Sequence, residues 1–248
     1  MLPLGAFLFW RFPVDGTGWW FVLGTVLLHI FYFLFLARAY AKADLSVVYP
    51  IARGMGPTLA PLLAVSILGE SVSPLAIVGI ASVVVGIYTV YWWGSFGQIF
   101  SDPLKLLKES GTRYAVFTGF LVASYSIWDK VGVSHVTPFL YMYLMSVGTA
   151  IGMAPYLIKA HGMPAIRSEL KVNGLGIVGV ALLSFLAYGL VLTALTFSQV
   201  SYIAPSREIG IVVGVLLGTL VLKEPFGGGR LLGAGLIAAG PVIMTLAP

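Results

Sequence analysis

The fold is decided by residues 43–87, which read ADLSVVYPIARGMGPTLAPLLAVSILGESVSPLAIVGIASVVVGI. This stretch holds two apolar runs, which a short polar segment around Glu70 joins. The first run contains Pro50 near its start, and the second carries Gly79 and Gly86. A helix that crosses a membrane needs about 20 predominantly apolar residues. We therefore interpret the stretch as two consecutive membrane-spanning helices.

A fainter copy of this pattern appears near the end of the chain. Pro205 stands 155 positions after Pro50, and Glu224 stands 154 positions after Glu70. The two glycines that bound residues 233–240 keep the offset of 154 from the glycines of the first copy. Self-similarity at a fixed offset is the sequence signature of a repeated structural unit. The chain is therefore expected to contain two related halves.

The composition of the chain indicates that its solvent is lipid. Of the 248 residues, 59% are hydrophobic and only 9% are charged, and the mean hydropathy is +0.99. A soluble domain carries about 25% charged residues, so a water-soluble fold is excluded. The alternating ten-residue pattern of a transmembrane barrel is absent from the sequence, which leaves helices as the spanning element. We predict an all-α polytopic membrane protein.

Charge and cysteine usage narrow the classes of function. The formal net charge of +5 fits loops that face anionic lipid headgroups, so no nucleic-acid partner is expected. The sequence has no cysteine, which excludes disulfides and cysteine-based metal or nucleophile chemistry. His29, His135 and His161 lack the spacing of metal ligands. We predict no metal site, no cofactor and no catalytic residue.

Eight apolar segments are long enough to be full spans, whereas residues 1–10 are too short to cross a membrane alone. The expected spans are residues 19–41, 45–69, 74–93, 114–134, 137–159, 174–197, 202–222 and 230–247. Residues 160–173 are expected to form a basic linker between two of these spans.

The spans divide into two unequal halves. We place the first half at residues 1–93, a connecting loop at 94–113 and the second half at 114–248. The second half supplies five spans, and the first supplies three and the short N-terminal segment. A five-span unit reverses its direction in the membrane on duplication, so matching halves would be inverted repeats. We expect an N-terminally shortened form of a ten-helix fold, which lacks the first helix and part of the second.

Residues 40–86 resemble the EamA-type repeat of the drug/metabolite transporter superfamily. In the first half the resemblance rests on DLSVVYP (residues 44–50), ARG (52–54), Pro57, GE (69–70), Gly79 and Gly86. In the second half it rests on YSIWDK (125–130), AP (204–205), RE (207–208), KEP (223–225), Gly233 and Gly240. The resemblance implies a transporter of two inverted five-helix halves around a central cavity for a small-molecule solute.

Ionisable and aromatic side chains inside the spans form the candidate site, because an ionisable group at membrane depth is a functional hypothesis by default. We expect a substrate cavity or gate at Tyr49, Pro50, Arg53, Tyr125, Trp128, Asp129, Lys130, Tyr188, Tyr202, Pro205, Arg207 and Glu208. Proton coupling is a hypothesis for His29, Asp129 and Glu208.

The depths of the charged residues within their spans predict how they pair. The end of the span that carries residues 129–130 and the start of the span that carries residues 207–208 share one membrane face. We therefore expect Asp129 or Lys130 to pair with a residue of 207–208 and to close one end of the cavity. By the symmetry of the repeat, Arg53 is expected near the opposite face.

Structural roles stay open for the same residues. The charges could reach lipid headgroups or hold helices together, and the aromatic rings could pack between helices. Pro50 and Pro205 suit either the first turn of a helix or a hinge with freed carbonyl groups. A lone buried His29 could bond a backbone carbonyl. Glu70 and Glu224 are expected to cap the helix that follows each of them, or to meet lysines at the membrane interface.

We predict an integral membrane transporter, in the bacterial inner (plasma) membrane, that moves a small metabolite or drug-like solute by alternating access. Its expected partners are that solute, membrane lipid, and a second copy or another chain that supplies the missing helix. Two alternatives stay open: a truncated non-transporting remnant or accessory subunit, and a membrane-embedded enzyme. The enzyme has weak support, because the sequence shows no paired carboxylates at helical spacing and no nucleophile with a base nearby.

Overall fold

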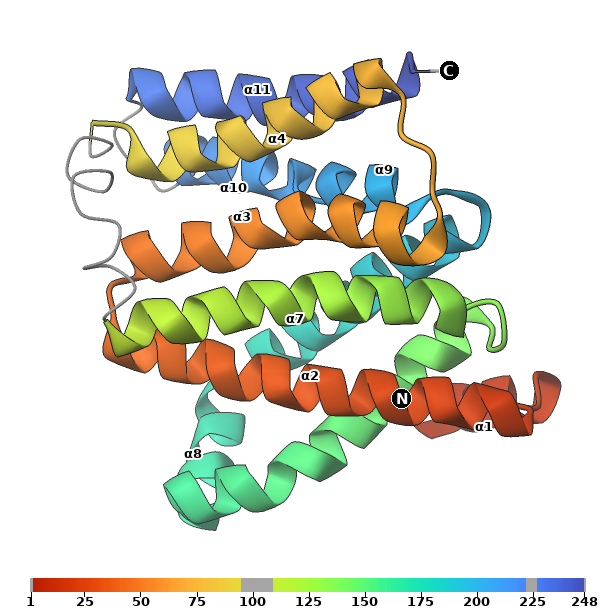
Figure 1. The fold of residues 1–248 in the computed structure, drawn as a ribbon. Coiled ribbons are helices and arrows are strands. Elements are labelled where there is room, and N and C mark those ends of the chain that lie inside the picture. The colour runs from red at the N-terminus through yellow and green to blue at the C-terminus, as the bar shows by residue number, and fades with distance from the viewer. Residues whose placement is uncertain (1, 95–108, 222–226, 248) are drawn as a thin grey trace. The chain divides into compact units, whose positions relative to one another are not determined.

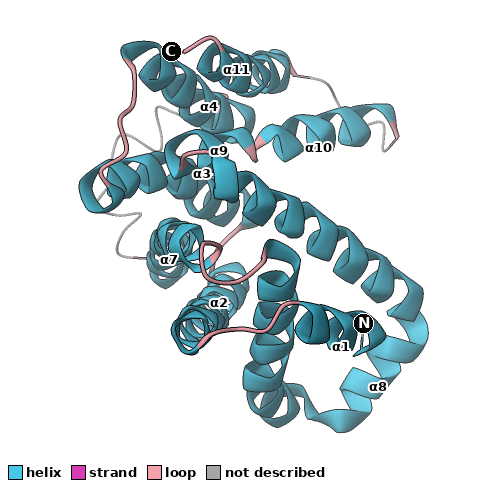
Figure 2. Ribbon diagram, turned by 90° about the vertical axis from the view of Figure 1, so that its right-hand side faces the viewer, coloured by secondary structure: helices cyan, strands magenta, loops and turns pink. Residues whose placement is uncertain are grey.

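The computed structural model describes residues 2–94, 109–221 and 227–247, and the regular elements in these ranges are all helices (Figures 1 and 2). They are α1 (Leu2–Arg11), α2 (Gly16–Lys42), α3 (Leu45–Leu63), the π-helix η1 (Ala64–Leu68), α4 (Pro74–Trp92), α7 (Ser110–Gly132), α8 (Pro138–Phe197), α9 (Val200–Ser206), α10 (Ile209–Leu220) and α11 (Gly228–Thr245). The predicted all-α fold is confirmed. Most of the predicted connecting loop, like Glu224, lies outside the described residues.

Six helices of the described ranges are long and apolar enough to cross a membrane by length and composition. They are Gly16–Lys42, Val47–Leu68, Pro74–Trp92, Pro138–Phe197, Val200–Leu220 and Gly228–Thr245. The sequence predicts eight spans, and the difference has two sources. α7 is not among the six, since its serines, threonines and charged residues lower its hydropathy, and the 60 residues of α8 cover two expected spans.

α8 consists of two helices that meet at Gly162, inside the predicted linker at residues 160–173, and the other residues of this linker are helical. Its alanine, leucine, lysine and glutamate residues are good helix formers, so charge alone does not end the helix there. The side chain of Asn173 also donates a hydrogen bond to Glu169 one turn earlier, at 2.6 Å. Within α8, Gly162 alone has non-helical dihedrals, with φ 79° and ψ 152°, and these dihedrals produce the kink. Dihedral angles in this region of φ/ψ space are adopted almost exclusively by glycine.

The chain forms two compact units, and each contains segments that are distant in sequence. The first unit contains Met1–Ile30 and Trp128–Phe197, and the second contains Phe31–Ile127 and Ser198–Pro248. α2 and α7 therefore each contribute residues to both units. The division into halves at residues 1–93 and 114–248 concerns the sequence repeat and stays a prediction.

In the second unit, α4 and α11 pack so closely that their backbones meet at two glycine pairs. A Cβ atom on Gly79 would lie 2.8 Å from the carbonyl oxygen of Gly240, and one on Gly86 would lie 2.8 Å from that of Gly233. The earlier glycine of α4 meets the later glycine of α11, so the two helices run antiparallel. Close backbone approach at small residues is the usual way in which helices pack in lipid.

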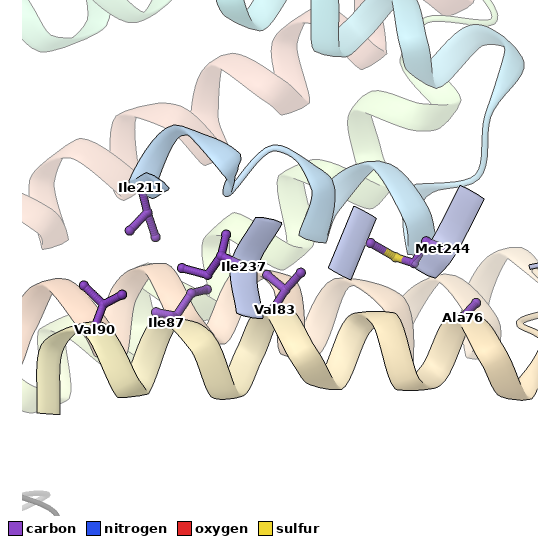
Figure 3. Close-up of a cluster of buried hydrophobic side chains, with 7 residues drawn as sticks. All are labelled: Ala76, Val83, Ile87, Val90, Ile211, Ile237 and Met244. Carbon is purple, nitrogen blue, oxygen red and sulfur yellow. The ribbon is translucent and has the colours of Figure 1, made fainter. Parts of the chain in front are cut away.

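A hydrophobic cluster surrounds the α4–α11 contact (Figure 3). It is formed by Ala76, Val83, Ile87, Val90, Ile211, Ile237 and Met244, from α4, α10 and α11. The hydroxyl of Ser82 adds a hydrogen bond to the backbone oxygen of Leu236 at 2.8 Å. This core holds α4 and α11 together, next to the helices that carry the charged residues of the same unit.

Candidate functional site

The two prolines of the sequence repeat, Pro50 and Pro205, both lie inside helices. Each is the sixth residue of its helix, in α3 and α9 respectively. A proline at that depth removes a backbone hydrogen bond, whereas a proline in the first turn would not. The alternative in which both prolines start a helix is therefore wrong, and both weaken the local helix instead.

A break between α9 and α10 follows Pro205. α9 ends at Ser206 and α10 begins at Ile209, so Arg207 and Glu208 form the turn between them. Glu208 is 2% exposed, while the side chain of Arg207 is 12% exposed. The break therefore places an acidic and a basic side chain in the interior of a candidate span.

Two arginines share the carboxylate of Glu208. Its Oε1 lies 3.4 Å from Nε of Arg207 and 3.9 Å from Nη1 of Arg53 on α3. Each guanidinium also lies over an aromatic ring, Arg53 over Tyr49 at 5.8 Å and Arg207 over Tyr125 at 5.7 Å. A buried charge is tolerated when charged groups of opposite sign surround it. We call Tyr49, Arg53, Tyr125, Arg207 and Glu208 the arginine cluster.

The structure pairs Arg53 with a partner that the sequence did not predict. The side chains of Arg53 and Glu208 meet, while the placement of the two residues near opposite faces of the membrane stays a prediction. Arg53 lies eight positions after the first residue of α3, and Glu208 lies eight positions after the first residue of α9, or about 12 Å in each case at 1.5 Å per residue. The carboxylate of Glu70, which follows η1, bonds the N-terminus of α9, so α3 and α9 run in opposite directions. The two side chains therefore approach each other from opposite ends of antiparallel helices.

Asp129 is the centre of a second group of polar residues, which lies in the first unit. Its side chain is fully buried, and both carboxylate oxygens accept hydrogen bonds from tyrosine hydroxyls. Tyr141 donates to Oδ1 at 2.9 Å, and Tyr188 donates to Oδ2 at 2.7 Å. The ammonium of Lys130 donates to the backbone oxygen of Leu195 at 2.6 Å. We call Asp129, Tyr141 and Tyr188 the aspartate group.

Two further candidates pack around the aspartate group. The indole N–H of Trp128 donates to the backbone oxygen of Phe21 at 2.9 Å. His29 is buried, its Nδ1 donates to the backbone oxygen of Thr25 at 2.9 Å, and its ring meets that of Tyr188 edge-on at 6.0 Å. The backbone-bonded arrangement expected as the alternative for His29 is thus present.

The remaining candidates have different surroundings. Tyr202 packs against the hydrophobic cluster of α4, α10 and α11, which fits the packing alternative for this ring. The predicted pairing of residues 129–130 with residues 207–208 would join the two units and stays a prediction.

A cavity of about 370 Å³ lies in the first unit, lined by apolar side chains of α8 together with His161 and Glu169, and no predicted site residue lines it.

Sequence reasoning missed two residues that shape these groups. Tyr141 was not a candidate, because one tyrosine in an apolar span gives no sign of what it will contact. Glu70 was expected to cap the helix that follows it, but the hydroxyl of Ser73 accepts the capping bond of α4, from Ala76. Glu70 caps α9 instead, by accepting a bond from the backbone N–H of Val200 at 2.8 Å.

Comparisons with known proteins agree with this architecture. The model of the EamA-like transporter family matches residues 110–246, and that of the Small Multidrug Resistance protein matches residues 11–83. No curated protein matches the chain. A solved structure described only as the crystal structure of a protein is similar in fold, with a TM-score of 0.72. The two chains are 17% identical, over 94% of this chain and 78% of the other.

Both families consist of membrane transporters of the drug/metabolite type, so the apolar helices belong to an integral membrane protein. The two matches include residues of both units, and the first match alone covers more than half of the 248 residues. The chain belongs to the EamA-like transporter family.

Proposed function

We propose that this transporter moves a small solute by alternating access, through a water-filled passage that Arg53 lines. One observation carries the proposal: the side chain of Arg53 is 45% exposed although it lies within a candidate span, about 12 Å beyond the first residue of α3. An exposed charge at that depth is costly against lipid, and such residues face a water-filled cavity or the bundle interior. The passage therefore supplies the water that Arg53 contacts.

The alternative in which Arg53 reaches the headgroups has less support. An extended arginine side chain spans about 7 Å, which is shorter than the distance of its Cα from the start of α3. Its guanidinium is also held over Tyr49 and within 3.9 Å of Glu208. These contacts hold the charge inside the span.

Alternating access is supported by the sequence repeat and by the packing of α4 on α11. A Cβ on Gly79 would meet the oxygen of Gly240, and a Cβ on Gly233 would meet that of Gly86. The repeat offset of 154 relates Gly79 to Gly233 and Gly86 to Gly240, so it converts the first contact into the second, as a two-fold axis would. Inverted repeats of this kind let one half take either of two arrangements around a fixed site.

Asp129 is the residue that carries the coupled proton. Its two partners are hydroxyl groups, and a hydroxyl can either donate or accept a hydrogen bond. Asp129 can therefore gain a proton without leaving a buried polar atom unbonded. Glu208, in contrast, is held by two fixed positive charges, which suits a permanent carboxylate at the passage.

The test uses the full chain in liposomes. A panel of small solutes, spanning anions, neutral molecules and cations, is measured for uptake with and without a pH gradient. We expect Arg53→Gln to abolish the flux that the unmodified chain supports. Arg38→Gln, which changes an exposed arginine of α2, is the matched control and should leave the flux unchanged. Equal flux in both variants and in the unmodified chain would contradict the proposed passage.

A further inference from the structure

We infer that the passage selects anionic solutes, with a carboxylate or phosphate group as the feature that the arginine cluster recognises. This inference rests on the proposed function, because it concerns the solute of the same passage. Three observations in the second unit carry it: the balance of charge, the occupancy of the aromatic rings and the exposure of Arg53.

The balance of charge in the arginine cluster is positive. Two guanidinium groups share the single carboxylate of Glu208, which leaves one positive charge. The other acidic residues that the structure describes in this unit lie elsewhere. Glu70 is held by the start of α9, Asp44 precedes α3, and Glu109 precedes α7. An excess positive charge in a low-dielectric interior favours an anion and repels a cation.

The aromatic rings of the cluster are occupied by the protein's own cations. Cationic solutes are commonly bound over the faces of tyrosine and tryptophan rings. Here the guanidinium of Arg53 lies over Tyr49, and that of Arg207 lies over Tyr125. A cationic solute would have to displace an arginine from each ring while meeting its charge, so the rings do not form a cation site.

Arg53 is the group that can contact the solute. At 3.9 Å, its Nη1 is close enough to Glu208 for charge attraction but too far for a hydrogen bond. A side-chain hydrogen bond with Tyr49 uses only part of the five N–H donors of the guanidinium, so donors remain for another acceptor, and the side chain is 45% exposed. The planar donors of arginine match the two oxygens of a carboxylate or phosphate. The side chain of Arg207 is only 12% exposed, so it adds positive charge to the cluster without contacting the solute.

The selectivity can be measured without knowing the natural solute, because the chain has no cysteine. Tyr49→Cys creates a unique thiol beside Arg53. The full chain in liposomes is labelled with two methanethiosulfonate reagents, one bearing a sulfonate and the other a trimethylammonium group. Each rate is divided by the rate of the same reagent with a free thiol. The same rates are measured after adding Arg53→Gln.

We expect the sulfonate reagent to react about tenfold faster than the ammonium reagent, and Arg53→Gln to remove most of this preference. Equal rates, or a preference for the ammonium reagent, would overturn the anionic inference while leaving the water-filled passage intact. Thr58→Cys, five residues after Arg53 on α3, gives the same comparison if the first variant does not fold.

Failure of the proposed function would be distinguishable from failure of the selectivity. Thr245→Cys places a thiol in an exposed position at the end of α11 and serves as the control for reagent access. If Thr245→Cys is labelled while neither reagent reaches Tyr49→Cys or Thr58→Cys, the passage is not filled with water. That outcome would overturn the proposed function and, with it, the anionic inference.

Discussion

Glu70 and Ser201 stand 131 positions apart in the chain, yet one carboxylate oxygen of Glu70 accepts two hydrogen bonds from Ser201. The backbone N–H donates at 2.9 Å and the hydroxyl at 2.7 Å. The N-terminus of a helix has unsatisfied N–H groups and a partial positive charge, so a carboxylate is its preferred partner. Glu70 thereby ties the end of η1 to the start of the helix that leads to Arg207 and Glu208.

Replacing Glu70 by glutamine should therefore weaken the second unit. An amide offers one oxygen, and its NH₂ group would face the N–H donors of α9. We expect Glu70→Gln to lower the free energy of unfolding by about 2 kcal/mol, measured by denaturant titration of the chain in detergent. Ser201→Ala loses only the hydroxyl bond and should cost about 1 kcal/mol. If Glu70→Gln costs no more than Ser201→Ala, the charge of Glu70 does not hold α9.

Gly233 on α11 should not tolerate a methyl group. A Cβ there would lie 2.7 Å from the oxygen of Gly86 and 2.7 Å from the nitrogen of Val90, which are backbone atoms that move little. We expect Gly233→Ala to lower the free energy of unfolding by about 2 kcal/mol through overpacking. Gly235→Ala on the same helix is the matched control, because nothing lies within 4 Å of a Cβ there. Equal stability of the two variants would show that α4 and α11 are not in backbone contact.

Asp129→Asn should uncouple transport from the pH gradient while preserving the fold. Asparagine keeps the shape and can bond both Tyr141 and Tyr188, since a hydroxyl accepts as well as donates, but it cannot change its charge. We expect uptake that no longer responds to a pH gradient, and a loss of stability under about 1 kcal/mol. Asp15→Asn changes a carboxylate that is 60% exposed and should keep the response. A persistent gradient response in Asp129→Asn would assign the proton to another group.

Gly162→Ala should strain the kink of α8. The dihedrals φ 79° and ψ 152° are nearly inaccessible to alanine, so we expect a cost of about 2 kcal/mol in unfolding free energy. Gly174→Ala in the same helix has open space around its Cβ and should instead gain about 0.5–1 kcal/mol from helix propensity. Thermal unfolding of both variants in detergent makes the comparison. A stabilising Gly162→Ala would mean that α8 is straight at this residue.

The helical fold could be predicted from sequence because lipid leaves few alternatives for a chain of this composition. Boundaries were less predictable where charge and helix propensity disagree, as at residues 160–173, where the chain leaves the helical conformation at Gly162 alone. The ionisable residues inside the apolar runs could be found from the sequence, since few such groups interrupt these runs. Their partners could not be predicted, as the contact between Arg53 and Glu208 shows.

The missed contacts share a physical cause. Which hydroxyl reaches Asp129, or which helix start meets Glu70, depends on packing between segments that are distant in the chain. No local pattern around Tyr141 or Ser201 records that packing. The repeat offset identifies equivalent residues in the two halves of the sequence, but it does not predict which of these residues are in contact.

The glycine contacts between α4 and α11 have a mechanical consequence. Where side chains separate two helices, rotamer changes allow the helices to slide, but α4 and α11 touch through main-chain atoms at two heights. Sliding by one residue would drive a side chain into the opposing backbone at both heights. We therefore expect α4 and α11 to move as one rigid pair. A rearrangement within this unit would instead bend α3 and α9, because each of these helices contains proline.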